Sequence, residues 1–478
     1  MSPKPLTFNL AHEPPPKRRL TAVVAVAAVL LILIVSGLVW FAYPRINPKV
    51  IDGPLPPAPP ATPAPTYIAF NIKTEEELEF IINKVGGWEV ATTGEHQLAV
   101  SAHLNPLGNV YTGKEYPFIV DKTKVRTELE KLKSYHLPIV LSVFAGKFFE
   151  SRITDYLEQD QINLMFDQFN KPISLDIVGG TYFTISPSSG GLSKNEYLDL
   201  YEKNTKAIIT EVVKFINENP DLIIGISFAG EVKYPPAKEG EGKDLVLQWA
   251  DYGTFALARY RQFLQDKYDD YFEAFVRAAK IPPGTFAGFA TVDPPRGFNR
   301  GAWDNLDDPT NPHFLIWHEF RVDEVVNHIK QTIQWVKEAG LKEGLVTKIY
   351  SHQAIWEGQA NYYWHGAPIE TLAIPGINPV VSLYGEKTGD EDFIARVGAI
   401  AAPYPGRWGS LQYNPDGPCL EKNVCDPLGY PVAEYLRRLE LAAANGARII
   451  GVYEDDTTHF IRDNFYVAVK EFLINNNE

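Results

Sequence analysis

The stretch IIGISFAGEVKYPP, residues 223 to 236, decides how the rest of the chain is interpreted. Its apolar run favours a buried strand, its second glycine allows close approach of the backbone, and its two prolines stop the strand. Glu231 therefore stands where burial ends. A carboxyl group at such a boundary is partly desolvated, which raises its pKa and suits it to donate a proton near neutral pH. An equally good interpretation is a glutamate that pairs with Lys233 or caps the next helix.

Seven other apolar segments of strand length occur in the chain, and helical patterns separate them. Such alternation over about 400 residues is typical of the α/β class and predicts one parallel (β/α)8, or TIM, barrel. An open doubly wound sheet is the alternative, but it usually carries a glycine-rich phosphate loop that this sequence lacks. The predicted strands are residues 98–104, 138–145, 178–185, 222–229, 344–350, 379–384, 407–413 and 447–453.

The N-terminal region predicts a membrane anchor. Residues 20–44 carry no charge and are long enough to cross a bilayer as one transmembrane helix. Basic residues in the tail before them, residues 1–19, favour a cytoplasmic N-terminus and an extracytoplasmic body, so that the segment acts as an uncleaved signal-anchor. Residues 45–66 are rich in proline and predict an extended linker. The barrel domain then spans 67–478.

Composition limits the partners of this body. The chain of 478 residues has 45% hydrophobic and 22% charged residues, as globular proteins do, and a net charge of -14. Because the tail is basic, the body is more acidic than the whole chain, which argues against nucleic acid or an anionic membrane surface as its partner. The histidines show no metal-binding spacing, so we expect no metal and no cofactor. Cys419 and Cys425 are expected to form a disulfide in an exported domain.

In a parallel barrel the functional residues follow the strands on one face. Exposed carboxylates at such positions also serve as helix N-caps, an alternative that applies equally to Glu386 and Asp456. The candidates, in chain order, are His103 and Asn105 after the first predicted strand, Glu231 after the fourth, His352 and Trp356 after the fifth, Tyr384 after the sixth, Gln412 and Asn414 after the seventh, and Glu454 and Asp455 after the eighth.

The loop after the fifth predicted strand, IYSHQAIWEGQANYYWHG, places Trp356 and Trp364 among amides and tyrosines. Aromatic faces beside amides suit a sugar, because the C–H face of a pyranose stacks while its hydroxyl groups take hydrogen bonds. A loop that folds over its own small core is the alternative. We favour the sugar platform, since so many aromatic residues on a loop would otherwise be exposed.

Two segments resemble glycoside hydrolases of the large barrel clan. AGEVKYP, residues 229 to 235, is similar to the segment of the family 14 β-amylases that bears their acid glutamate after strand four. LARYRQFLQDKYDDYFEAF, residues 257 to 275, and HEFRVDEVVNHI further on resemble the region after the acid/base residue of the family 42 β-galactosidases. In those enzymes the motif is Asn-Glu, whereas Gly230 replaces the asparagine here.

The resemblance implies that Glu231 is the general acid and that Tyr384 lies beside the position of the nucleophile. Clan enzymes carry a second glutamate after strand seven, but this chain has Gln412, which can neither attack nor take a proton. Another carboxyl group must then act, and we expect Glu454 or Asp455 to face the barrel axis. Asp416 and Glu386 are the other acids near the mouth.

Two functions remain open. The first is a membrane-anchored, extracytoplasmic glycoside hydrolase for a neutral oligo- or polysaccharide, with Glu231 as acid and His103, Asn105, His352, Trp356, Trp364, Tyr384, Gln412 and Asn414 as substrate-binding residues. The second is a catalytically inactive barrel that binds carbohydrate or acts as a surface scaffold. Turnover that is lost in Glu231→Gln would favour the first.

Overall fold

The computed structural model describes residues 65–104, 110, 119–143, 164–177, 180–183, 186, 196–228, 234, 237–239, 246–299, 301–306, 308–351, 374–416, 429–454 and 461–475. Every described residue belongs to one compact unit, residues 58–478. The predicted membrane segment lies outside the described residues. Among the helices that the structure does describe, none is long and apolar enough to cross a membrane.

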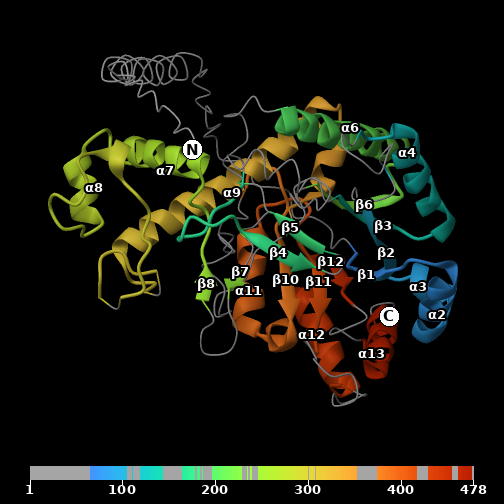
Figure 1. Ribbon diagram of the computed structural model, residues 1–478. Helices are drawn as coiled ribbons and strands as arrows, with labels where there is room; N and C mark the ends of the chain where they lie inside the picture. The colour runs from blue at the N-terminus through green and yellow to red at the C-terminus, as the bar shows by residue number, and fades with distance from the viewer. Residues whose placement is uncertain are drawn as a thin grey trace, which may run out of the picture. The chain divides into compact units, whose positions relative to one another are not determined.

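The described chain contains an eight-stranded parallel sheet, as the alternation of strands and helices predicts (Figure 1). The strand order is β10-β11-β12-β1-β2-β3-β6-β9. The two end strands meet through Asn378, whose N–H donates to Ile349 O over 2.9 Å and whose carbonyl accepts from Ser351 N over 3.0 Å. The sheet is therefore closed into a (β/α)8 barrel. Its strands are β1 (Tyr67–Asn71), β2 (Gln97–Leu104), β3 (Ile139–Val143), β6 (Ile223–Ser227), β9 (Ile349–Tyr350), β10 (Val380–Tyr384), β11 (Trp408–Asn414) and β12 (Ala447–Val452).

One predicted barrel strand is wrong. Of the predicted residues 178–185, the described part, β5 (Gly180–Phe183), does not join the barrel but pairs antiparallel with β4 (Ser174–Ile177) in a separate hairpin. Ile177 pairs with Gly180, so only two residues separate the paired positions. Strands whose paired positions are this close in sequence favour a local hairpin over a place in the barrel.

The true first strand, β1, is missing from the sequence prediction. It is a five-residue run, YIAFN, that directly follows the proline-rich linker and ends just before a helix start. The predicted first strand, β2, is thus the second strand of the barrel. The prediction misses β1 and includes one false strand before β6, so the number of strands up to β6 is unchanged. The stretch ending near Glu231 is therefore strand four of the barrel, as predicted. The predicted strand at 344–350 is mostly the 3-10 helix η7 (Glu343–Lys348), with only β9 in the sheet.

The helices follow the predicted pattern closely. Thr74 caps the first one: its hydroxyl accepts from Glu77 N over 3.2 Å, and the Glu77 carboxylate accepts from Thr74 N over 3.3 Å. The described helices are α2 (Glu75–Val85), α3 (Trp88–Thr92), α4 (Lys122–Lys131), α6 (Glu196–Glu218), α7 (Thr254–Lys267), α8 (Phe272–Ala278), α9 (Pro312–Glu338), α11 (Glu391–Ala401), α12 (Val432–Ala444) and α13 (Asp463–Asn475), with short 3-10 segments η1 (Leu132–Tyr135), η6 (Phe289–Thr291) and η9 (Gly385–Gly389).

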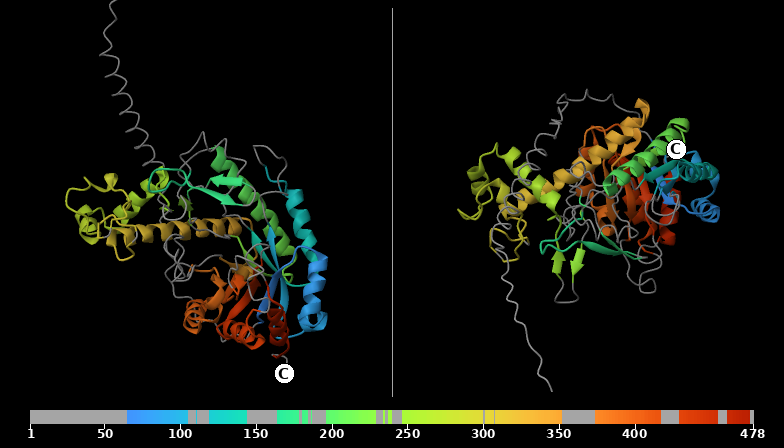
Figure 2. Two further views of the ribbon diagram at one scale, coloured as in Figure 1. Left: turned by 60° about the horizontal axis from the view of Figure 1, so that its bottom comes forward. Right: turned by 45° about the horizontal axis from the view of Figure 1, so that its top comes forward.

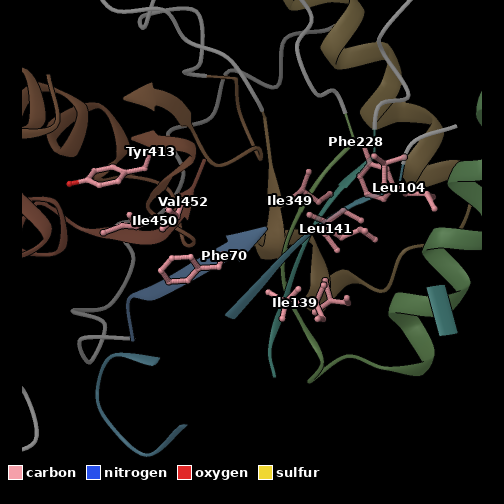
Figure 3. Packing of buried hydrophobic residues seen from close by; sticks show 14 of the residues in the cluster. Phe70, Leu104, Ile139, Leu141, Phe228, Ile349, Tyr413, Ile450 and Val452 are labelled. Carbon is pink, nitrogen blue, oxygen red and sulfur yellow. The ribbon is translucent and has the colours of Figure 1, made fainter. Parts of the chain in front are cut away.

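The outer and the inner face of the barrel sheet each form an apolar layer. Alternate residues point outward against the helices, as Figure 3 shows for Phe70, Leu141 and Val452. The residues between them fill the barrel with small, branched and aromatic side chains: Ala69, Ala99, Val140, Tyr350, Val380, Leu411 and Ile449. A Cβ at Gly225 would lie 2.4 Å from Ile449 Cδ1, so a larger residue at this inner position would force the Ile449 side chain to move. The barrel interior is a packed core at this level.

A second core lies in the long segment between β6 and β9. We name residues 249–320 the aromatic lobe, because buried aromatic side chains from α7, α8 and the first half of α9 fill it. Phe314, Trp317 and Phe320 of α9 belong to this core, whereas Val325 and Ile329 of the same helix belong to the barrel core. Figures 1 and 2 show α9 running from the lobe to the barrel. One helix thus connects two cores. The small hairpin of β7 (Ala237–Glu239) and β8 (Val246–Gln248) precedes the lobe.

Candidate active site at the barrel mouth

The inner face of the barrel changes from apolar to polar toward the carboxyl ends of the strands. Ser142 pairs in register with His103 on one side and with Ser227 on the other, and the flanking residues of these strands pack outward. Both serines are buried, and the imidazole of His103 is exposed. Because all eight strands are parallel, these groups lie at one end of the barrel, where ligands bind in this architecture. We call this end the mouth.

Gln412 is the best-defined polar group of the mouth. Its Oε1 accepts a hydrogen bond from Tyr384 Oη over 2.8 Å and another from Ser382 Oγ over 3.1 Å. All three side chains are half-buried. The ring of Tyr453, at the end of β12, meets the Tyr384 ring edge to face at 6.2 Å. The mouth therefore holds a fixed amide between two hydroxyl donors and beside two tyrosine rings.

A β-bulge explains why Gln412 reaches this position. The pairing of β11 with β12 shifts between Ser410 and Tyr413. Leu411 packs in the inner core, and yet the next residue, Gln412, also contacts inward-facing groups on β10. Two successive residues share a face only where an extra residue interrupts the alternation, and bulges of this kind often reorient a side chain at a functional site.

Asn414 connects strand ends. It is buried; its Nδ2 donates to Tyr453 O over 3.0 Å and its Oδ1 accepts from Asp416 N over 3.1 Å. The Asp416 carboxylate in turn accepts from Tyr435 Oη on α12, and together with burial it raises the pKa of that tyrosine. These bonds join the ends of β11 and β12 to α12 at the mouth. The predicted contact of Asn414 with substrate stays a prediction.

Glu454 is exposed, and its described contacts lie toward α13. Its Oε1 accepts from Ile461 N over 3.4 Å. Burial raises the pKa of Tyr466 on α13, and the negative charge of Glu454 raises it further. Of the two carboxyl groups expected to assist Glu231, Glu454 is the one that the structure describes, and its role stays a prediction.

Several predicted residues lie outside the described part of the chain. They are Glu231, Asp455, Asn105, His352, Trp356 and Trp364, together with the predicted disulfide partners Cys419 and Cys425. Of the predicted site, the structure brings Tyr384 and Gln412 into direct contact. It places Asn414 beside them on β11 and His103 across the barrel on β2.

Sequence reasoning missed Ser382, Ser142, Ser227 and Tyr453. The signal for Ser382 was present, because Val380, Ser382 and Tyr384 alternate in the segment VVSLY and must share one face. Ser142 and Ser227 are interior positions of apolar runs and carry no local signal of their own. Only the register of neighbouring strands aligns them with His103.

A buried charged cluster lies between α9 and the segment that follows strand four. The guanidinium of Arg321 on α9 is buried and stacks on Tyr234 at 4.3 Å and on Trp317 at 4.8 Å. Burial lowers the pKa of Arg321 to about 10. Tyr234 is also buried and follows Glu231 by three residues, so this stacking attaches the segment after strand four to α9.

Asp251 is the acid of this cluster. Its Oδ1 accepts from Gly253 N over 2.7 Å and from Phe166 N over 3.2 Å, and Ser186 donates to the same carboxyl group. Burial raises the pKa of Asp251 to about 6 despite these donors. The carboxyl group thus fastens the loop after β3 to the start of the aromatic lobe.

Neither the protein-family models nor the curated proteins give a sequence match. By structure, the chain is similar to the catalytic domain of β-amylase from Paenibacillus polymyxa, with a TM-score of 0.56 and 11% identity over 87% of this chain and 99% of that one. It is also similar to an exo-carrageenase of family GH42 from Bacteroides ovatus, with a TM-score of 0.51 and 12% identity over 87% of this chain. The chain spans about half of that enzyme, 51% of its length. The predicted resemblance is confirmed at the level of the fold: this chain has the (β/α)8 barrel that these glycoside hydrolases adopt.

Proposed function

We propose that this protein is a membrane-anchored, extracytoplasmic glycoside hydrolase that acts on a neutral oligo- or polysaccharide at the barrel mouth. The observation that carries the proposal is the fixed set of Gln412, Tyr384 and Ser382 at the mouth of a glycoside-hydrolase-like barrel. An amide, hydroxyl groups and tyrosine rings recognise sugar hydroxyl groups and ring faces without requiring charge on the ligand. The acidic body agrees with a neutral substrate.

In this proposal Glu231 gives its proton to the glycosidic oxygen as the bond to the anomeric carbon breaks. Gln412 cannot form a glycosyl ester, so the new bond comes from a water molecule that a second carboxylate deprotonates. Glu454 or Asp455 is the proposed base. The products are two sugars with free hydroxyl groups; the base then holds the proton taken from water, and proton exchange with solvent returns both carboxyl groups to their starting states.

Turnover by the full-length chain in detergent tests this role. Substrates are a panel of aryl glycosides and neutral oligosaccharides. We expect Glu231→Gln to lower turnover by about 10²- to 10⁴-fold, the usual contribution of general acid catalysis. Glu273→Gln, an exposed position on α8, is the matched control and should act as the original chain does. Full activity in Glu231→Gln would contradict the assignment.

A second function has one specific observation in its favour. The two hydroxyl donors hold an amide, not a carboxylate, at the centre of the mouth. An inactive barrel that only binds saccharide would have this composition. Calorimetric binding of a saccharide, without any product after long incubation, would establish that alternative.

The membrane location is part of the proposal. Residues 20–44 would span the bilayer with the N-terminus in the cytoplasm, and residues 45–66 would separate the barrel from the surface. The full chain should sediment with membranes, and protease added outside spheroplasts should digest the barrel. A chain that stays in the supernatant would contradict the anchor.

A further inference from the structure

Two exposed phenylalanines from separate segments stack on each other beside the aromatic lobe. Phe169 lies in the described loop after β3, and Phe298 lies in the lobe between η6 and α9. Their ring centroids are 6.4 Å apart and their planes meet at 30°. Phe169 is 46% exposed and Phe298 37%, whereas the aromatic side chains that form the lobe core are buried. Together the two rings present a flat apolar surface to solvent, which a ligand could cover.

The segment that carries Phe169 is held rigidly. The buried carboxylate of Asp167 accepts from Phe169 N over 2.9 Å and from Lys171 N over 2.8 Å, which closes the turn. Its other oxygen accepts from Gln248 Nε2 over 3.0 Å. The Phe169 backbone is therefore fixed before any ligand arrives.

Arg296 joins the two segments. Its Nη1 donates to Gln168 O over 2.8 Å and to Asn170 Oδ1 over 3.0 Å, and its guanidinium stacks on the Tyr252 ring at 4.5 Å. Arg296 stands two residues before Phe298, and its acceptors flank Phe169 in sequence. The two rings are thus held together by polar contacts behind them, and their geometry does not depend on the stacking alone.

Both segments leave the same end of the barrel as the mouth. The loop with Phe169 follows strand β3, and the lobe with Phe298 follows strand β6; in a parallel barrel both connections start at the carboxyl face. Asn170 is exposed next to Phe169 and presents an amide at the edge of the rings. The pair combines flat apolar faces with polar groups at the rim, which is the composition of a sugar-binding surface.

We propose that Phe169 and Phe298 form a secondary saccharide-binding platform, which holds pyranose rings of a neutral polysaccharide whose chain extends from the mouth. This inference rests on the proposed function and adds that the preferred ligand is polymeric. The C–H faces of successive sugars pack on the two rings, while the exposed amide of Asn170 hydrogen-bonds to their hydroxyl groups. The acidic body disfavours an acidic glycan.

Affinity electrophoresis tests the platform directly. The full-length chain in mild detergent is run in native gels that contain starch, galactan, mannan or mixed-linkage β-glucan. We expect at least one polymer to retard it, and Phe169→Ala/Phe298→Ala to raise the apparent dissociation constant for that polymer by about tenfold. Phe80→Ala is the matched control, because Phe80 is 51% exposed on α2 and contacts α13 instead. Binding of the corresponding disaccharide should be equal in both variants and the original chain.

Retardation that persists unchanged in the double variant would overturn the platform. Lack of retardation of the original chain by every polymer would also overturn it and would favour a protein partner for this surface. Absence of turnover on the retarding polymer bears only on the proposed hydrolase function, since retardation requires no bond cleavage. The two proposals therefore fail in different measurements.

Discussion

Gln412 accepts two hydrogen bonds at a position where a carboxylate would be better stabilised than an amide. Tyr384 and Ser382 both donate to its Oε1. Donors of this kind favour the charged form of a carboxyl group and lower its pKa. A single substitution at position 412 can therefore test whether the amide of Gln412 is what prevents nucleophilic catalysis in this barrel.

Gln412→Glu should create a nucleophile between the two existing donors. If Glu231 is an effective acid, we expect turnover of activated aryl glycosides to rise by at least about tenfold, with retention of the anomeric configuration. Proton NMR of the first-formed sugar measures the configuration. Gln412→Asn changes the same position without adding charge and should give no gain. A Gln412→Glu variant no more active than the original chain would contradict this expectation.

Asp251 predicts a specific dependence of stability on pH. Burial raises its pKa to about 6 in the folded protein, against roughly 3.9 when unfolded. Between these values the folded state binds more protons than the unfolded state. Its contribution to stability is therefore complete below about pH 4 and is lost as the pH rises through about 6, by roughly 3 kcal/mol.

Asp251→Asn removes this titration while keeping an oxygen that can accept from Gly253 N and Phe166 N. The unfolding free energy of the original chain, measured relative to that of the variant by urea denaturation, should fall by roughly 3 kcal/mol between about pH 4 and pH 7. Parallel pH profiles of the two proteins would show that Asp251 has an ordinary pKa.

At the level of elements, α9 carries the connection between lobe and barrel. Its 27 residues extend about 40 Å at 1.5 Å per residue, long enough for its two halves to enter different cores. The N-cap is Asn311, whose Oδ1 accepts from His313 N over 3.0 Å, and Pro312 occupies the first turn. Farther along, Glu324 on α9 binds both Nε and Nη2 of Arg259 on α7, at 2.7 to 2.9 Å.

Neighbouring residues of α9 provide a matched test of the lobe core. Phe314 is buried against Trp249 and Trp317, whereas Leu315 is 40% exposed. Phe314→Ala should lower the unfolding free energy by about 3–5 kcal/mol because it leaves a cavity. Leu315→Ala should change it by less than about 0.5 kcal/mol. Urea denaturation followed by tryptophan fluorescence measures both, and equal effects would mean that the lobe is not packed as described.

Closure of the barrel is a property of the whole molecule, and Asn378 is central to it. Besides its backbone bonds to Ile349 and Ser351, its Nδ2 donates to Thr347 O over 2.6 Å and to Ile349 O over 2.9 Å. Its Oδ1 accepts from Gly406 N over 2.9 Å. The side chain thus joins the residues around β9 to the segment before β11, across the seam where the sheet closes.

Asn378→Ala should lower the unfolding free energy by about 2–4 kcal/mol, because buried backbone groups at the seam lose their partners. Asn445→Ala is the control: that side chain makes one local bond, from Nδ2 to Leu441 O, and its loss should cost about 1 kcal/mol. Differential scanning calorimetry gives both values. If Asn378→Ala lowers the unfolding free energy no more than Asn445→Ala does, the Asn378 side chain does not contribute to closure of the barrel.

Local sequence patterns predicted the fold class and the order of the helices correctly, and seven of the eight predicted strand segments contain a strand of the barrel. These features depend on the periodicity of apolar residues and on helix caps such as Thr74. They also placed Tyr384 and Gln412 among the residues that follow strands on one face, and the resemblance to glycoside hydrolases implied that Tyr384 lies beside the position of the nucleophile. Which apolar segments enter the barrel depends instead on tertiary pairing. Residues 67–71 pair on both sides, whereas 180–183 pair with their own neighbour, and that choice depends on partners far away in the chain. The orientation of Gln412 likewise depends on a bulge in β11, which no local pattern predicts, because it arises from pairing with β12.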